Sequence, residues 1–429
     1  MSGSVYTDAT WNTIRLEAKR TLVLAVALLS GCELLVFEGC EETDTPLAEV
    51  RIRAGYGGEA FDLHPTNDGG FILAGYKAAR PYGSGGFEDS YDTHVIKTDG
   101  MGNVAWSTTY GVDGSDRGLR IRPFEDGYLV MGNAAREAGL FLLRIDETGN
   151  EIWRRNYGAR TRDRGAGLCV DANGDIVVVG EAGAGGFVGE AFIAKLDADA
   201  NELWRTIVSN KAYSAAEDVV ATADGGFVLA GYQNQVLDNA FGNHTVEALT
   251  VKVDGNGEVI WKTIHPPAFL RGQYRWRSIT LLDDGGFALV GYTGSESSVA
   301  RITDRGARVW EVNRRGYIFA EGRDIVEAPD GSIVMAGISF TYNNPVAGLP
   351  LCNDYFVVRF SADGIEEWSE IYGAGNYEVA NAIALGADGL FMVAGTDREP
   401  YVAQEGFGNI YLVMTDAGWN QDSKIVVRE

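Results

Sequence analysis

The chain has few of the residues that build the commonest metal and nucleophile centres. Its 429 residues include only four His and four Cys. The histidines form no His-x-x-x-His or Glu-x-x-His pair, so they lack the spacing of helical zinc ligands. No Gly-x-Ser-x-Gly segment occurs, which argues against an α/β-hydrolase nucleophile. Carboxylate pairs for glycoside hydrolysis stay possible because acidic residues are abundant.

Positive charge is also scarce. The chain has 36 Lys and Arg against 60 Asp and Glu, for a net charge of −24. Such a surface repels phosphate backbones, so we expect no nucleic-acid partner. The same charge would attract cationic partners or divalent cations, but an acidic surface that only keeps the protein soluble explains it equally well.

The apolar run at residues 21–29 is too short for an ordinary membrane-spanning helix. It follows Arg15, Lys19 and Arg20 and runs into Leu29-Ser30-Gly31-Cys32. This order resembles the signal peptide and lipobox of bacterial lipoproteins. The resemblance implies cleavage before Cys32 and lipid on its thiol, so that the N-terminal lipid is the only membrane contact. The alternative is a buried hydrophobic helix with a core cysteine.

Three segments are therefore expected. Residues 1–31 form the signal peptide, residues 32–47 an acidic tether, and residues 48–429 a single folded domain. Glu33 follows the cysteine. In many Gram-negative bacteria a residue other than Asp at this position accompanies sorting of a lipoprotein to the outer membrane, so we expect the outer membrane or cell surface. The remaining cysteines are Cys40, Cys169 and Cys352; a Cys40–Cys352 disulfide and two free thiols are both possible.

A repeat of about fifty residues organises the folded part. Its clearest element is Asp-x-x-Gly-x-x-x-Trp, complete at Asp99–Trp106, Asp146–Trp153 and Asp254–Trp261. Three copies have one change, and a seventh, from Thr415 to Asp422, lacks the Trp. A second element, Asp-Gly-Gly-Phe followed by an apolar run, precedes three copies, and weaker versions that begin at Asp126, Asn173, Asp330 and Asp388 precede the others. Repetition at this period indicates a propeller, a solenoid or an array.

Each unit contains four strands. Asp-Gly and Asn-Gly favour tight turns between strands, and the β-branched and aromatic runs that follow are typical of buried strands. We therefore predict an all-β fold, a seven-bladed β-propeller of four-stranded antiparallel blades. The repeated tryptophans are expected to pack between neighbouring blades as structural residues. They are Trp106, Trp153, Trp204, Trp261, Trp310 and Trp368.

The two ends of the chain are incomplete in complementary ways. Residues 49–55 form an outer strand with no blade of its own, and Ile52 is expected in the position of the missing Trp because Tyr56-Gly57 follows it. Blade seven lacks its Trp at Asp422. We predict that the N-terminal strand closes blade seven. The alternative is that residues 424–427 complete that blade themselves.

The Asp-x-x-Gly turn and its Trp resemble the tryptophan-docking repeats of quinoprotein-like bacterial β-propellers. With the Asp-Gly-Gly-Phe element, the chain is also similar to secreted and lipoprotein repeat families of bacteria. A lipid-anchored propeller of this kind resembles an assembly scaffold that has no catalytic activity, although that relative usually has eight blades. The adjacent cysteine pair beside the cofactor in pyrroloquinoline-quinone enzymes is absent here, so no cofactor is expected.

Length varies on one face only. The long segments 77–91, 233–246, 339–354 and 397–408 share a face with the connections between blades. Aromatic and Arg side chains there predict a recognition surface for a protein, peptide or glycan, although packing within the loops explains them too. The candidate binding residues are Tyr82, Phe87, Tyr91, Phe241, Arg271, Arg275, Tyr342 and Tyr401.

Two weaker possibilities stay open. The turns at 197–202 and 254–258 resemble parts of calcium loops, but both lack the full ligand set. We expect a binding or scaffold protein held outside the cytoplasm. The alternative is a glycan hydrolase or lyase with carboxylates at the mouth of the central channel.

Overall fold

The computed structural model describes the chain in fourteen segments. They cover residues 48–52, 57–78, 91–111, 115–134, 139–157, 163–183, 189–211, 213–238, 243–267, 272–315, 319–341, 352–372, 377–398 and 408–416. No helix among these residues is long and apolar enough to cross a bilayer.

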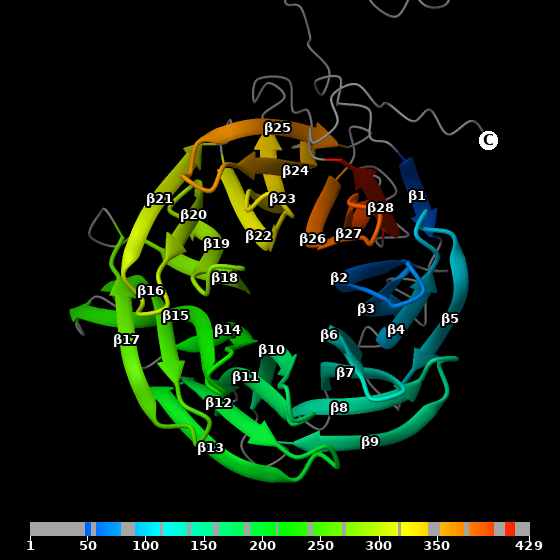
Figure 1. Cartoon of the computed structure of the whole chain (residues 1–429), viewed down its shortest axis with the longest axis horizontal. Coiled ribbons are helices and arrows are strands. Elements are labelled where there is room, and N and C mark those ends of the chain that lie inside the picture. Colours follow the sequence, from blue (N-terminus) through cyan, green and yellow to red (C-terminus); the bar gives the residue numbers. More distant parts are fainter. Residues whose placement is uncertain are drawn as a thin grey trace, which may run out of the picture.

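Seven antiparallel blades of four strands form a closed ring, which confirms the predicted fold (Figure 1). Blades one and two consist of β2 (Gly58–Pro65), β3 (Phe71–Ala78), β4 (Tyr91–Thr98), β5 (Val104–Tyr110), β6 (Asp116–Phe124), β7 (Gly127–Ala134), β8 (Gly139–Asp146) and β9 (Glu151–Tyr157). Blades three and four consist of β10 (Arg164–Val170), β11 (Ile176–Ala182), β12 (Glu190–Leu196), β13 (Glu202–Ser209), β14 (Ala215–Ala221), β15 (Phe227–Asp238), β16 (Asn243–Val253) and β17 (Val259–His265).

The ring continues with three more blades. Blades five and six consist of β18 (Tyr274–Leu281), β19 (Phe287–Thr293), β20 (Glu296–Ile302), β21 (Arg308–Arg315), β22 (Phe319–Glu327), β23 (Ile333–Thr341), β24 (Cys352–Phe360) and β25 (Glu366–Tyr372). Blade seven consists of β26 (Tyr377–Leu385), β27 (Phe391–Arg398), β28 (Asn409–Thr415) and β1 (Ala48–Ile52).

The hydrophobic core is divided into layers between blades. Each of seven clusters draws its residues from two neighbouring blades; one joins Val177 and Ile193 of blade three to Phe227 and Leu249 of blade four. The middle strands of each blade are buried on both faces, as their apolar runs predicted. Burial between blades therefore makes the ring one cooperative structure.

The repeated tryptophans join each blade to the next, as predicted. The Trp261 indole N–H donates to the backbone oxygen of Asp304, in the turn between the third and fourth strands of the next blade, at 3.3 Å. Trp106, Trp204 and Trp310 make the same bond across their own interfaces. Gly306 in that turn has φ of +77°, and a Cβ there would lie 2.9 Å from the Trp261 ring. The Gly of Asp-x-x-Gly thus makes room for the indole.

A cation opposite each Trp supports the same layer. Lys97 pairs with Trp106 across strands β4 and β5, and its ammonium lies 2.8 Å from Asp68 in the Asp-Gly turn of its own blade. Equivalent ion pairs join Arg144 to Asp126, Lys195 to Asp171, Lys252 to Asp224, Arg301 to Asp284 and Arg359 to Asp330. The two turns of a blade are therefore tied together beneath its Trp.

Strand β1 closes the ring, as the complementary ends predicted. It pairs with β28 from Ala48↔Met414 to Ile52↔Ile410. The predicted alignment of this strand was wrong by four residues. Phe391 pairs with Thr415 as Phe71 pairs with Thr98, so the last turn begins at Asp416 and Ala48 occupies the Trp position. Ile52 occupies the position of Tyr110; residues 417–429 lie outside the described residues.

The packing of Gly102 supports this alignment. A Cβ on Gly102 would meet Val50 at 3.2 Å. Val50 lies two residues after Ala48, and the threonines two residues after Trp106, Trp204 and Trp261 meet the corresponding glycines. Small and branched side chains of β1 thus replace the indole at the seventh interface.

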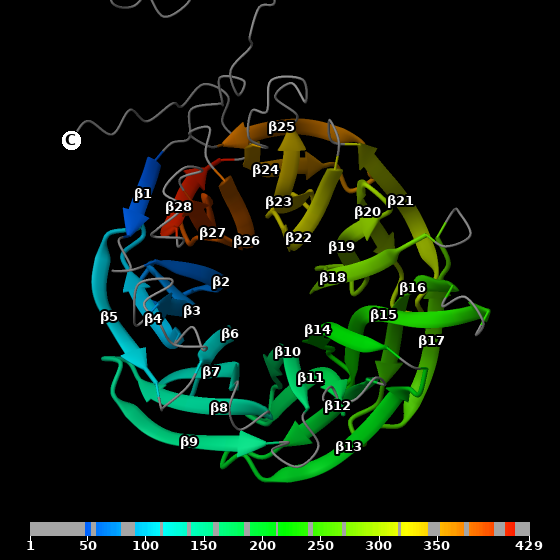
Figure 2. The same cartoon turned by 180° about the vertical axis from the view of Figure 1, so that it is seen from behind.

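Described residues near the ends of the second and third strands lie beside described residues of the connections between blades, on the side of the ring away from the short turns; Figure 2 shows the ring from behind Figure 1. The backbone N–H of Val246 donates to Gly272, and that of Ser214 donates to Gly189. One predicted loop was too long: β15 extends to Asp238 and β16 begins at Asn243, so much of 233–246 is hairpin. This segment begins with three consecutive polar residues, Gln233, Asn234 and Gln235, so its sequence did not indicate a strand.

We predict that Trp261→Ala lowers the free energy of unfolding by about 3–5 kcal/mol, because it leaves a cavity against Gly306 and removes the bond to Asp304. Ile260→Ala is the matched control. Ile260 is 56% exposed, so its truncation should change stability by about 0.5 kcal/mol or less. Urea denaturation of both variants measures the difference; equal losses would contradict a specific role for the indole.

Candidate functional site

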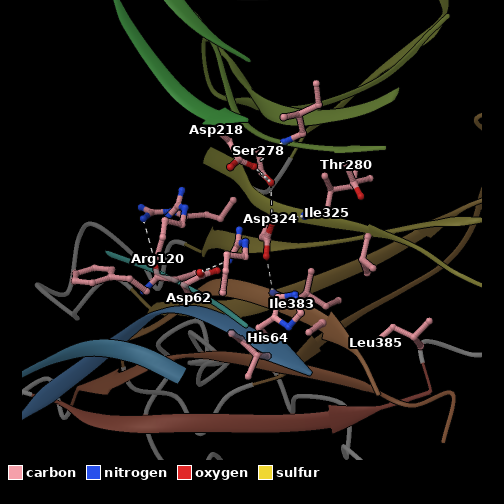
Figure 3. Close-up of a pocket in the computed structure, with 18 of the residues that line it drawn as sticks. Asp62, His64, Arg120, Asp218, Ser278, Thr280, Asp324, Ile325, Ile383 and Leu385 are labelled. Atoms are coloured by element: carbon pink, nitrogen blue, oxygen red, sulfur yellow. Dashed lines mark hydrogen bonds and ion pairs between the residues drawn. The ribbon is translucent and has the colours of Figure 1, made fainter. Parts of the chain in front are cut away.

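The described part of the central channel contains a polar cavity of about 290 Å³. Its walls come from the innermost strands β2, β6, β14, β18, β22 and β26, which Figure 1 shows around the centre of the ring. Figure 3 shows the charged and hydroxyl groups that line it. Among the lining residues are the acids Asp62, Asp218 and Asp324, the cations Arg120, Arg122 and Arg323, and the hydroxyl residue Ser278.

The key residues occupy one repeated position. Every inner strand carries a register shift near its middle, and the residue that follows the shift lies six positions before the Asp or Asn of the next turn. From blade one to blade seven these residues are Asp62, Arg120, Gly167, Asp218, Ser278, Asp324 and Ala382. A bulge of this kind bends the strand and redirects side chains. The repeat therefore brings variable residues to one level of the channel.

Each of the three carboxylates binds the next blade. Asp62 accepts the backbone N–H of Ile121 at 2.7 Å, and Asp218 accepts that of Ile279 at 3.1 Å. Asp324 accepts the N–H of Ile383 at 2.9 Å. Such bonds satisfy buried backbone donors and hold the carboxylates in place. At the seventh interface the Asn381 amide donates to Glu59 and to the backbone oxygen of Ala60 instead.

A serine hydroxyl bridges two of these acids. Ser278 Oγ lies 3.0 Å from Asp218 Oδ2 and 2.8 Å from Asp324 Oδ1. Figure 3 shows the resulting series of bonds from Asp218 through Ser278 and Asp324 to Ile383. One hydroxyl has one hydrogen to donate, so it cannot donate to both carboxylates. The arrangement is fully bonded when Asp324 holds a proton and donates it to Ser278, which in turn donates to Asp218.

Burial is the main cause that raises the pKa of Asp324 to about 6; the charges of Asp62 and Asp218 add to it, and the bonds from Ile383 and Ser278 oppose it. Burial alone would lower the pKa of Arg122, but Asp62, Asp218 and Asp324 together raise it. Arg122 stays charged and faces all three acids, whereas Asp324 exchanges its proton near neutral pH.

Guanidinium groups form the opposite wall. Arg122 donates from Nη1 to Asp62 at 2.5 Å and to the backbone oxygen of Ile121. Arg120 donates only to the backbone oxygen of Leu119 among the described residues. Since a guanidinium carries five N–H donors, most donors of both side chains are unused there. In the ring β6 lies across the channel from β18 and β22 (Figure 1).

The cavity lies in one half of the channel. Its lining residues come from the second halves of the inner strands, such as His64 and Pro65 of β2 and Leu385 of β26. These halves end at the short turns. Burial and the nearby Arg122 charge lower the pKa of His64, so this imidazole is neutral at pH 7. The described cavity therefore lies nearer the short turns. The sequence had predicted a binding surface on the opposite, variable face.

Of the eight predicted binding residues, only Tyr91 and Arg275 lie in the described part of the chain. Tyr91 is 8% exposed and packs edge-on against Tyr76, with ring centroids 4.8 Å apart. The Arg275 guanidinium lies over the Tyr232 ring, 4.0 Å from its centroid. Both contacts join residues of β-strands, and the binding roles of Tyr91 and Arg275 stay predictions.

The calcium-like turns use their carboxylates internally. Asp254 accepts the backbone N–H groups of Asn256 and Glu258, and Asp197 accepts that of Asn201. Across the described residues, no three His, Cys, Asp or Glu side chains are grouped to hold a metal ion. Cys169 is a buried free thiol whose pKa burial raises to about 12. Cys32 and Cys40 lie outside the described residues, as does the side chain of Cys352.

Sequence reasoning missed the channel residues, although a signal was present. Counting back six positions from each Asp-Gly or Asn-Gly turn aligns Asp62, Asp218 and Asp324 without a structure. The chain has so many acidic residues that those on the inner strands did not stand out in the sequence.

Comparison with known proteins finds similar solved structures but no family. No family model matches, and no curated protein matches. Among solved structures, a protein of unknown function from Dyadobacter fermentans is 10% identical with a TM-score of 0.46, covering 86% of this chain and 98% of that one. YCF48 bound to D1 peptide is 11% identical with a TM-score of 0.49, covering 90% and 99%. A protein of unknown function from Bacteroides caccae is 11% identical with a TM-score of 0.41, covering 70% and 93%.

We predict that Asp324 makes the protein less stable as pH rises from about 4 to 6. Its pKa is raised in the folded state, so folding favours the protonated acid, and that stability is lost as pH rises through about 6. The side chain of Asp324→Asn is neutral at every pH. Between pH 4 and pH 8, the free energy of unfolding of this variant should therefore rise relative to that of the wild type by up to about 3 kcal/mol. The difference in stability between the two proteins at pH 4 reflects the hydrogen bonds that the substitution changes, so only the change of this difference with pH tests the prediction.

The measurement is urea denaturation of both proteins at several pH values, with exposed Asp304→Asn as the control. Parallel pH profiles for Asp324→Asn and wild type would contradict a proton shared at this site.

Proposed function

We propose that this protein is a lipid-anchored binding or scaffold protein that works outside the cytoplasm and holds its ligands on the propeller. The observation that carries the proposal is the channel cavity, where fixed acids face guanidinium donors that remain unused among the described residues. Side chains already held by neighbouring blades need little ordering when a ligand binds, which favours affinity.

The bonding of the acids favours binding over catalysis. Asp62, Asp218 and Asp324 each accept a backbone N–H of the next blade, so each has a structural role in the ring. Removing one would disturb an interface between blades as well as the cavity. A ring that positions charges in this way is suited to recognition.

The variable face is the proposed surface for a larger partner. At their described ends, the hairpins of the second and third strands are bonded to the connections between blades, as Val246 is to Gly272 and Gly189 is to Ser214. Arg275 stacks on Tyr232 at this side of the ring. We propose that Tyr82, Phe87, Tyr91, Phe241, Arg271, Arg275, Tyr342 and Tyr401 contribute to recognition of a protein, a peptide or a glycan.

One observation favours the enzymatic alternative. Asp324, with its pKa raised to about 6, lies one hydroxyl away from Asp218. A protonated acid beside an ionised one is the pairing that glycan hydrolysis uses. The alternative is a glycan hydrolase or lyase with its carboxylates at the mouth of the central channel.

The lipid anchor predicts a clear change in location. Cys32→Ser removes the thiol that would carry lipid, so the protein should move from the membrane fraction to the soluble fraction of a bacterial host. Cys169→Ser, at a buried thiol, is the control and should leave the location unchanged. Metabolic labelling with a radioactive fatty acid should mark the wild type and not Cys32→Ser. Unchanged fractionation and labelling would contradict the lipobox.

Recognition through the variable face predicts binding on glycan and peptide arrays. Arg275→Ala should weaken such binding by about tenfold or more without unfolding the protein, because it removes a charged contact. Arg305→Ala, on an exposed turn of the opposite face, is the matched control. Equal binding by both variants would contradict a site on the variable face. Release of glycan fragments that Asp324→Asn abolishes would favour the enzyme instead.

A further inference from the structure

The channel cavity has a mainly acidic wall and a mainly basic wall, although Asp62 is bonded to Arg122 on the basic side and Arg323 adjoins Asp324 on β22. One wall contains Asp218 and Asp324, joined by Ser278, on strands β14, β18 and β22. The other contains Arg120 and Arg122, both from β6 across the ring. A cavity of this kind orients a ligand that carries both signs of charge, since each end finds its own wall.

The acidic wall has unused bonding capacity. Asp218 is only 6% exposed and lines the cavity. Its Oδ2 accepts Ile279 N–H and the Ser278 hydroxyl, whereas its Oδ1 has no hydrogen-bond partner in the described part of the chain. A buried carboxylate oxygen without a partner destabilises the protein, and a donor from a ligand would relieve that cost. An ammonium group offers three such donors.

The basic wall has unused donors. The Arg120 guanidinium makes one bond, to the backbone oxygen of Leu119, and no ion pair among the described residues. Arg122 uses Nη1 for Asp62 and for the oxygen of Ile121, which leaves its other nitrogens without described partners. Guanidinium groups bind carboxylates through paired N–H donors, so a ligand carboxylate fits this wall.

Charge balance and size narrow the ligand class. The six charged lining residues are Asp62, Asp218, Asp324, Arg120, Arg122 and Arg323, so their charges cancel when all are ionised. A ligand with a net charge would leave one wall uncompensated. The volume of about 290 Å³ is at the lower limit of ligand pockets and too small for an oligosaccharide or a peptide chain.

We propose that the channel cavity binds a small zwitterion of the α-amino acid class, with its carboxylate at Arg120 and Arg122 and its ammonium at Asp218 and Asp324. The proposal rests on the binding function and assigns a small ligand to the channel, separate from the partner on the variable face. The ligand would also lie among blades one, two, four and six, and so connect walls that are far apart in the chain.

The test is calorimetric titration of the full-length protein with each of the twenty standard L-amino acids. For every amino acid that binds, the same side chain is then tested as the carboxylic acid without the amine and as the amine without the carboxylate. For alanine these probes are propionate and ethylamine. The proposal expects at least one amino acid to bind about tenfold or more tightly than either singly charged analogue, because each lost charged contact weakens binding by that factor.

Two variants locate the site. Arg120→Gln removes a guanidinium with no described ion pair, and Asp218→Asn keeps an acceptor for the Ile279 N–H while removing the charge. Each should weaken binding about 10- to 100-fold, with an unchanged circular dichroism spectrum and melting temperature. Arg305→Gln, on the exposed turn, should bind as the wild type does.

Other outcomes overturn the proposal in distinct ways. Equal binding of propionate and alanine would show an anion site at the arginines, and binding that survives both variants would place the ligand elsewhere. No binding of any amino acid would also overturn it. Array binding that Arg275→Ala weakens would in each case leave the proposed binding function intact.

Discussion

The ring depends on one repeated contact, the docking of an indole on the glycine turn of the following blade, which the structure shows at four interfaces. The indole N–H bonds a backbone oxygen, and the Gly at positive φ leaves space for the ring, as Trp261 and Gly306 show. A four-stranded blade has two apolar faces and cannot bury them alone. Because every blade packs its apolar faces against its neighbours, the stability of each blade depends on a complete ring.

The inner strands use the same principle with different chemistry. Near the axis, a carboxylate of one blade bonds the backbone of the next, as Asp62 does with Ile121. These positions vary among blades because Arg, Gly, Ser and Ala replace Asp at the others. The outer contact is uniform and structural, whereas the inner one combines structure with a local pattern of charge. Function can therefore vary at the axis while the frame stays constant.

The repeat made the fold predictable, since Asp-x-x-Gly-x-x-x-Trp identifies the outer strand of each blade and the stray strand near Ile52 implies closure. Its register was mispredicted because Tyr56-Gly57 resembles the strand end at Tyr110-Gly111, and only the pairing of Thr415 with Phe391 distinguishes the two. The cavity was not predicted. Its walls assemble Arg120, Asp218 and Asp324 from three blades, and the six-residue spacing that aligns these positions before each turn does not by itself show that they face inward.

Closure by β1 has a consequence for how the protein is made. The Arg51–Asp397 ion pair at the closing blade spans 346 positions, so the first strand to be synthesised waits for nearly the whole chain before it finds its partner. Contacts this distant in sequence form slowly, and during that time an unpaired strand edge is open to other chains. Arg51 and Glu49 place charge on that waiting strand, which disfavours pairing with the wrong edge. The order of synthesis therefore matters for folding of this ring, because β1 must stay unpaired until its partner β28 has been made.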